Sequence, residues 1–282
     1  VGNILDDSGS QSASVHAPGI LLPNDRAVDG AKIYLTRVLE DGKSYLKDRY
    51  EDYPQARYGI LASSRDKELS EYGIANDWQS TRRVRVGPWF VEDESDPQSC
   101  RRLEIAVTEF QCQGLELDMA LVGWGTDLIR EEAGWSIRKS TKYAKRGRTS
   151  PKNPMQMRIN AYRVLLTRGR DGTIIFVPPI SDLDETYQYL LDCGIPELID
   201  GEIRYSGTPQ LMAEYARLAR DIGVRIIGGC CGTTPEHLAV MRQALETHSP
   251  RPSPNIERVV ELLGPVTPGT RMCCEKDYVV SI

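Results

Sequence analysis

Four short apolar runs in the first two thirds of the chain constrain its fold more than any other feature. They cover residues 57–62, 103–107, 117–122 and 173–177, and their length and composition are typical of buried strands. The stretches between them mix charged and apolar residues at helical spacing. Strands that alternate with helices form parallel sheets covered by helices on both faces. The sequence therefore predicts an α/β protein.

Helical patterns also occur outside these runs. Residues 31–50 predict one or two helices, and a charged helix is expected after Arg65. Near the C-terminus, Thr208-Pro209 and Thr234-Pro235 each place an N-cap before a proline at the first helical position. These signals predict helices over 208–222 and 234–245, separated by a strand over 224–227 and a loop.

Length and composition indicate a folded protein without a membrane segment. The 282 residues leave room for one large domain or two modest ones, after a Ser-, Gly- and Pro-rich stretch at 1–25 that predicts a flexible lead. Because the chain begins with Val1 in such a stretch, we expect it to enter midway through a longer gene product. No apolar run reaches the length of a membrane span and no signal peptide is evident, so the expected location is the cytoplasm. In that setting seven cysteines favour metal binding or reduced thiols over disulfides.

The formal net charge of −5 argues against a generally basic surface for nucleic acid, but one region is strongly basic. Residues 138–158 contain eight Lys and Arg residues and no acidic residue, and their Gly, Ser and Pro content predicts a loop. Two interpretations stay open: a solvated loop, or a surface that contacts nucleic-acid phosphates. The second would use Lys142, Lys145, Arg146 and Arg148.

Two segments carry a family resemblance. Residues 108–116 read TEFQCQGLE and residues 160–170 read NAYRVLLTRGR, which resemble the last two motifs of superfamily 1 helicases. Together with Trp124 and Gly134-Trp135, they are similar to the Schlafen group 3-like DNA/RNA helicase domain over about residues 25–198. The resemblance implies a RecA-like second domain over 26–198. It further implies ATP and Mg²⁺ held against a first RecA-like domain, and single- or double-stranded nucleic acid as a partner.

The resemblance also implies residue roles. Arg168 would be the arginine finger, a planar cation that stabilises charge on the γ-phosphate, with Glu116 and Gln113 as further catalytic residues. The implied nucleotide-binding residues are Thr108, Gln111, Gly114, Arg65 and Arg163. Structural alternatives stay open, because Gly114 can mark a turn and Arg168 can cap a helix. The helicase interpretation requires Arg168 and the loop around Gly114 to meet at the same edge of one sheet.

The sequence lacks the phosphate-cradling loop of a first RecA-like domain. Gly42-Lys43-Ser44 resembles the end of such a loop, but Arg37 stands where its first glycine belongs and the preceding residues predict a helix. We therefore expect the chain not to hydrolyse ATP alone.

A second resemblance begins near residue 194. Residues 226–238 read IIGGCCGTTPEHL, and adjacent thiolates at a strand end suit Zn²⁺, which takes three protein ligands at catalytic sites and leaves the fourth position open. Residues 194–265 resemble the C-terminal end of betaine- or cobalamin-dependent homocysteine S-methyltransferases, which are TIM barrels. This implies Cys230 and Cys231 as zinc ligands that activate homocysteine. The third ligand and the earlier barrel units are missing. His237 is expected to be a polar residue at a helix start and not a metal ligand. Cys273 and Cys274 near the C-terminus are an alternative source of the missing thiolate ligand.

Residues 194–198, Gly-Ile-Pro-Glu-Leu, are compatible with both families. We therefore expect a chimera, with 199–282 as a partial methyltransferase-like segment. Three functions stay open: half of an ATP-dependent helicase, a zinc-dependent homocysteine S-methyltransferase, and a catalytically silent nucleic-acid-binding module. Neither enzyme is expected to be complete in this chain.

Overall fold

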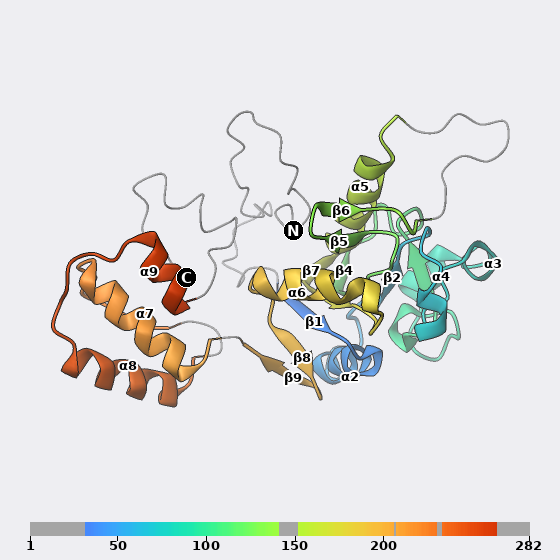
Figure 1. Cartoon of the computed structure of the whole chain (residues 1–282). Helices are drawn as coiled ribbons and strands as arrows, with labels where there is room; N and C mark the ends of the chain where they lie inside the picture. The colour runs from blue at the N-terminus through green and yellow to red at the C-terminus, as the bar shows by residue number, and fades with distance from the viewer. Residues whose placement is uncertain (1–31, 141–151, 206, 230–232, 264–282) are drawn as a thin grey trace. The chain divides into compact units, whose positions relative to one another are not determined.

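A seven-stranded sheet forms the centre of the larger part of the chain (Figure 1). The computed structural model describes residues 32–140, 152–205, 207–229 and 233–263. The strands lie in the order β3-β2-β4-β7-β1-β8-β9, and the pairs β1–β7, β1–β8, β2–β3, β2–β4 and β4–β7 are parallel. Their bounds are β1 Lys32–Thr36, β2 Tyr58–Ala62, β3 Ala106–Thr108, β4 Leu117–Gly123, β7 Gly169–Phe176, β8 Glu197–Ile199 and β9 Glu202–Arg204. The predicted α/β fold with a parallel sheet is confirmed.

Helices cover both faces of this sheet, as predicted. Side chains along β4 alternate between two cores, because successive residues of a strand point to opposite faces. Ala120 and Val122 join a core with α5 (Pro154–Leu166) and α6 (Asp184–Asp192), whereas Met119 and Leu121 join a core with α2 (Leu39–Arg49). Figure 1 shows α2 and α6 on opposite sides of the strands.

The helix predicted over 31–50 is partly wrong, because its first part is strand β1 and only Leu39–Arg49 is helical. Residues 32–36 read KIYLT and lie between β7 and β8, where both faces of the strand are covered, so apolar residues need no polar alternation. Gly42 lies inside α2, where a Cβ would meet Leu121 Cδ1 at 2.9 Å. The Gly42-Lys43-Ser44 string is therefore helical, as predicted, and its glycine lets α2 approach the sheet closely.

The strand predicted over 103–107 is shorter than expected. Leu103 has a φ of 55° and ends the 3₁₀ turn η2 (Cys100–Arg102), so β3 begins only at Ala106. The charged helix expected after Arg65 is a single 3₁₀ turn, η1 (Leu69–Tyr72). The remaining short elements of this part are α3 Trp78–Thr81, α4 Val86–Val91, β5 Ile129–Glu131, β6 Gly134–Ser136 and η3 Ser181–Leu183.

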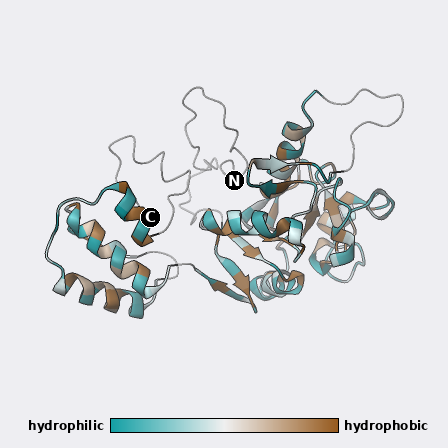
Figure 2. Cartoon of the chain, viewed as in Figure 1, coloured by the Kyte–Doolittle hydropathy of each residue, from teal (hydrophilic) through white to brown (hydrophobic). Residues whose placement is uncertain are grey.

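The chain divides into two units between Ile203 and Arg204. The second unit contains α7 (Pro209–Asp221), α8 (Pro235–Thr247) and α9 (Ile256–Leu263), and α7 packs against both other helices. The predicted caps are confirmed for α7, where Thr208 Oγ1 accepts a hydrogen bond from Leu211 N at 3.2 Å. Figure 2 shows polar and apolar residues alternating along α7 and α8, as amphipathic helices require.

The strand predicted over 224–227 is wrong. These residues have no regular secondary structure, and Ile226 is 92% exposed. A strand needs a neighbour to satisfy its backbone groups, and the described residues of this unit supply none. The observed order is therefore three helices, α7, α8 and α9, joined by segments without regular structure, with no closed barrel among the described residues.

Candidate functional site

The edge of the sheet at which the strands begin is called the amino edge here. At this edge the end of the first helicase-like motif, 108–116, meets the end of the second, 160–170. Arg168 follows α5 and precedes β7, while Leu115 and Glu116 precede β4. Arg168 Nη1 donates a hydrogen bond to Leu115 O at 3.2 Å, and Leu117 N donates to Arg168 O at 2.8 Å. Arg168 and the loop around Gly114 therefore lie at the same edge of one sheet, as the helicase interpretation requires.

The guanidinium of Arg168 also serves the end of α5. Its Nε donates to Val164 O at 3.0 Å and its Nη2 donates to Thr167 Oγ1 at 3.2 Å. These bonds satisfy groups that a helix terminus leaves without partners. The observed geometry therefore includes the helix-capping role that the sequence left open for Arg168.

Gly114 has a φ of 81°, and an added Cβ would meet nothing within 4 Å. The glycine is therefore required by its left-handed backbone and not by a close neighbour within the described residues. Gln113, Gly114 and Glu116 are all exposed at this loop. Arg163 lies on α5, where its Nη1 donates to Asn160 Oδ1 at 3.3 Å.

A cavity of about 950 Å³ opens at the same edge. Its lining includes Glu116 and Asp118 before and within β4, Arg170 and Asp171 of β7, and residues around the end of α2. Arg170 forms ion pairs with Asp118 and with Asp171, the latter at 3.4 Å. The nearby carboxylates raise the pKa of Arg170, Asp118 most strongly. The cavity thus offers fixed cations and carboxylates side by side. Its other lining residues are Arg49, Tyr50, Asp52, Tyr53, Pro54, Gln55, Ala56 and Arg57.

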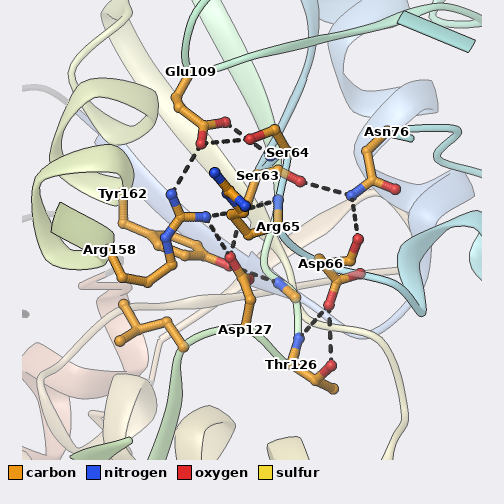
Figure 3. A network of polar contacts seen from close by, with 12 residues as sticks. Ser63, Ser64, Arg65, Asp66, Asn76, Glu109, Thr126, Asp127, Arg158 and Tyr162 are labelled. Atoms are coloured by element: carbon orange, nitrogen blue, oxygen red, sulfur yellow. Dashed lines mark hydrogen bonds and ion pairs between the residues drawn. The ribbon is translucent and has the colours of Figure 1, made fainter. Parts of the chain in front are cut away.

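The opposite, carboxyl edge of the sheet holds a buried ion network (Figure 3). Arg158, on α5, donates to Asp127 Oδ2 at 2.6 Å and to Glu109 Oε1 at 2.9 Å. Ser63, which follows β2, hydrogen bonds to both Arg158 and Asp127. Tyr162 Oη donates to Asp127 Oδ1 at 2.7 Å. All five side chains are buried, so the network joins β2, β3, the segment after β4, and α5 without help from bulk water.

The network contains one cation and two carboxylates. Burial raises the pKa of Asp127, while Arg158, Ser63 and Tyr162 oppose that shift. Burial alone would lower the pKa of Arg158, but the charges of Asp127 and Glu109 outweigh it and raise the pKa. Burial also raises the pKa of Tyr162. Because charges taken out of water need partners, each member of this network depends on the others.

Three of the predicted nucleotide-binding residues lie at this carboxyl edge. Arg65 is labelled beside the network in Figure 3, and its N–H donates to Ser63 Oγ at 3.1 Å. Gln111 bridges two segments, because its Oε1 accepts from Thr108 N at 3.0 Å and its Nε2 donates to Thr81 O at 2.9 Å. The polar groups of Thr108 and Gln111 are therefore used within the fold.

The strand register shows how far apart the two edges are. Thr108 is level with Ala62, which is level with Gly123, whereas Leu117 begins the same strand six residues earlier. At about 3.3 Å per residue, the two edges are roughly 20 Å apart. The structure thus divides the predicted nucleotide residues into two groups: Gly114, Glu116 and Arg168 lie at one edge, and Arg65, Thr108 and Gln111 lie at the other.

The basic stretch is only partly the predicted loop. Its last residues form the start of α5, and Arg158 is buried between carboxylates instead of facing solvent, because the helix turns it toward Glu109 and Asp127. Arg138 and Lys139 pair with Asp182. The predicted phosphate contacts Lys142, Lys145, Arg146 and Arg148 lie outside the described residues.

Cys230 and Cys231 also lie outside the described residues. Among residues 32–140, 152–205, 207–229 and 233–263, no group of three His, Cys, Asp or Glu side chains can hold a metal ion. His237 Nδ1 contacts Thr234 Oγ1 at 2.7 Å and its Nε2 contacts Gly207 O at 2.8 Å. The Nδ1 contact thus serves the start of α8, as predicted, whereas the Nε2 contact reaches Gly207, just before α7. The described part of the second unit does not fit a complete zinc site.

Sequence reasoning missed Asp127, Ser63 and Tyr162 as members of a polar cluster. Tyr162 lies inside the second motif, but its role depends on Asp127, which follows β4 in a segment without a periodic pattern. An acidic residue just beyond a buried strand was the available signal, since the ends of parallel strands gather at one edge.

The mostly parallel sheet with helices on both faces is an α/β domain of the RecA-like type. Each of the two helicase-like motifs begins near the carboxyl edge of this sheet and ends near its amino edge. The family comparison agrees, because the Schlafen group 3, DNA/RNA helicase domain matches residues 16–179. The chain belongs to this family. A second family, homocysteine S-methyltransferase, matches residues 180–245, so the chain joins segments similar to two families. No solved structure matches the chain.

The structure and the family matches divide the chain at different places. The methyltransferase match begins at residue 180, but α6 and β8 belong to the first unit. Leu183 and Leu190 lie in its core, and Leu35 of β1 pairs with Glu197 of β8. Only the part of the match after Ile203 therefore folds apart from the helicase-like sheet. No helix within the described ranges is long and apolar enough to cross a membrane.

Proposed function

We propose that this chain supplies the second RecA-like half of a nucleic-acid-dependent NTPase. The observation that carries the proposal is the meeting of Arg168 with the segment 114–116 at one sheet edge, in a chain that matches a helicase family. A nucleotide would bind beside these residues, where the cavity contains Glu116 and Arg170. The phosphate-cradling loop would come from a first RecA-like domain.

The position of these residues supports a shared site. Ligands of open α/β sheets ordinarily bind at the carboxyl ends of the strands, whereas Glu116 and Arg168 lie at the amino ends. A nucleotide at this edge would therefore be held mainly by another domain and completed by this one. Mg²⁺ and ATP would be bound largely by that domain, with this chain contributing cations and one carboxylate.

Each residue has a defined task in this proposal. The Arg168 guanidinium would exchange its bond to Leu115 O for a phosphate oxygen, and its fixed plane would stabilise charge that spreads over the transferred group. Arg170, which is exposed, would leave Asp118 to add a second cation. Glu116 is exposed and would accept hydrogen bonds from the ribose hydroxyls.

The test is ATP hydrolysis in the presence of single-stranded DNA. The chain alone is expected to remain at background, and a polypeptide that adds the first RecA-like domain of a family member is expected to hydrolyse ATP. In that polypeptide Arg168→Ala should lower kcat by a factor on the order of 10³–10⁵, and Arg168→Lys should not restore it. Arg102→Ala, at a half-buried arginine elsewhere in the first unit, is the matched control. If Arg168→Ala lowers kcat by less than tenfold, Arg168 only caps α5 and the proposed catalytic role is rejected.

A zinc-dependent methyl transfer to homocysteine is the second candidate, supported by the family match over 180–245. It would use Cys230 and Cys231 with a third ligand from another chain or segment. Zinc analysis of purified protein tests it directly. One zinc ion per chain that is lost in Cys230→Ser but kept in Cys193→Ser would support this function, and a zinc content near zero would reject it.

A further inference from the structure

Two large aromatic side chains are exposed close to the carboxyl edge of β3. Trp78 is 70% exposed and Phe110 is 66% exposed. Trp78 begins α3 and Thr81 ends it, and the Thr81 carbonyl accepts the Gln111 Nε2 hydrogen bond at 2.9 Å. Because Phe110 precedes Gln111, this bond joins the two segments that carry the exposed rings. Neither ring is buried in the described core, so packing does not explain why a large aromatic residue stands at either position.

One arginine lies over the first ring, and two more follow it in the sequence. Residues 78–91 contain Arg82, Arg83 and Arg85 and no acidic residue, and all three arginines are exposed. The Arg82 guanidinium lies 4.6 Å from the centre of the Trp78 ring. Arg85 contacts only a neutral partner among the described residues, Gln98 Oε1 at 3.4 Å. The surface therefore combines exposed rings with positive charge, although the whole chain carries a formal charge of −5.

Two carboxylates lie next to the rings in the sequence, and neither forms a described ion pair with these arginines. Asp77 accepts hydrogen bonds from Gln79 N, Ser80 N and Ser80 Oγ, which lower its pKa and hold it at the start of α3. Glu109, next to Phe110, is buried and paired with Arg158. Arg158 thus offsets the charge of Glu109, whereas Asp77 stays ionised; one carboxylate against three arginines leaves these segments net positive. A partner with many negative charges complements such a surface.

We propose that Trp78, Phe110 and Arg82, Arg83 and Arg85 form a binding surface for single-stranded nucleic acid. The base faces would stack on the two rings, and the phosphates would contact the three arginines. Only unpaired bases expose their faces to protruding rings, so the surface should prefer a single strand to a duplex. The class of partner rests on the proposed function, whereas the location and the strand preference follow from these residues.

The experiment measures binding of a labelled 20-nucleotide oligo-dT to the full chain by fluorescence anisotropy, without ATP. Trp78→Leu and Phe110→Leu should each weaken binding by roughly 5- to 150-fold, the range for loss of one stacked base. Trp78→Phe should retain most of the affinity because it keeps an aromatic face. Removing one arginine should reduce the slope of log Kd against log salt by about 0.7. Circular dichroism would verify that each variant is folded.

The leucine and phenylalanine variants distinguish the partners. Leucine keeps apolar character, so a protein-docking surface would tolerate Trp78→Leu, whereas a stacking surface would not. Normal oligo-dT affinity in both leucine variants would overturn this surface and leave the proposed NTPase intact, because that proposal is tested by Arg168. A hairpin duplex that competes as well as oligo-dT would overturn the strand preference. If the chain binds neither probe, both the surface and the proposed nucleic-acid partner fail.

Discussion

Arg158→Met should destabilise the first unit severely. The substitution keeps a long flexible side chain of similar reach but removes the cation that Glu109 and Asp127 share. Both carboxylates are buried, so they cannot recover their lost partner by contacting solvent. Ser63 and Tyr162 still donate to Asp127, but neither carries charge.

The expected magnitude follows from the buried pair. Removing one member of a buried ion pair costs about 3–5 kcal/mol, because it leaves an uncompensated charge. A domain has a free energy of unfolding of roughly 5–15 kcal/mol, so this loss is a large share of the total. With a urea dependence of about 2 kcal/mol/M, the unfolding midpoint should fall by about 2 M.

Tryptophan fluorescence during urea unfolding is a suitable assay. All four tryptophans, at positions 78, 89, 124 and 135, lie in the first unit, so the signal does not include the second unit. Trp124 also packs on Tyr162 of the network, with ring centroids 4.5 Å apart. Arg102→Met is the control, because the Arg102–Glu104 pair lies at the surface, with side chains 36% and 58% exposed, and surface pairs contribute roughly 0–1 kcal/mol.

The effect should depend on pH in a definite direction. Burial already raises the pKa of Asp127 in the folded protein, and loss of Arg158 removes one opposing charge. A carboxyl group with a raised folded pKa adds stability below its unfolded pKa and loses it as pH rises through the folded pKa. The deficit of Arg158→Met should therefore be largest at pH 7 and smaller near pH 5. A cost below 1 kcal/mol at pH 7, or a deficit that grows as pH falls, would refute the buried ion network.

Three further outcomes are expected. Tyr162→Phe should cost about 1–3 kcal/mol in the same unfolding assay, because Asp127 and the Gly125 N–H both lose a buried partner. Gly114→Ala should cost about 1–2 kcal/mol through its positive φ alone, because the added Cβ would meet nothing within 4 Å; an unchanged free energy of unfolding would contradict the backbone argument. A chain ending at residue 205 should keep the urea midpoint of its tryptophan signal, and a lower midpoint would show that the first unit depends on the second.

The sequence predicts the strands and helices whose position depends on residues close together in the chain. Apolar runs located β2, β4 and β7, and cap signals located α7 and α8, because a strand or helix start is specified by neighbouring residues. The sequence predicts a helix for the residues of β1, because a strand covered on both faces lacks the polar alternation that distinguishes a strand from a helix. The strand predicted over 224–227 is wrong for the opposite reason. The apolar pattern is typical of a buried strand, but the described residues contain no barrel strands with which it could pair.

The candidate site was predictable only where residues adjacent in sequence carry it. The two motifs identified Arg168 and the segment 114–116, but the spacing along the chain did not show that Thr108 and Gln111 face the other edge. Asp127 and Ser63 are 64 residues apart, and only the parallel pairing of β2 with β4 brings their segments to one edge. Long-range pairing of this kind leaves no signal in a local pattern.

The two motifs do not form a single site. Together they connect the two edges of the sheet. The segment 109–116 runs from the carboxyl end of β3 to the amino end of β4, and α5 runs beside it. Arg158 joins their starts through Glu109, and Arg168 joins their ends through Leu115 O. The 13 residues of α5 span about 20 Å, which equals the length of the seven-residue strand β4. The sequence order that identifies the family therefore reflects one helix and one loop that cross the sheet together, so the edge at which a motif residue lies depends on its position along α5 or along the segment 109–116.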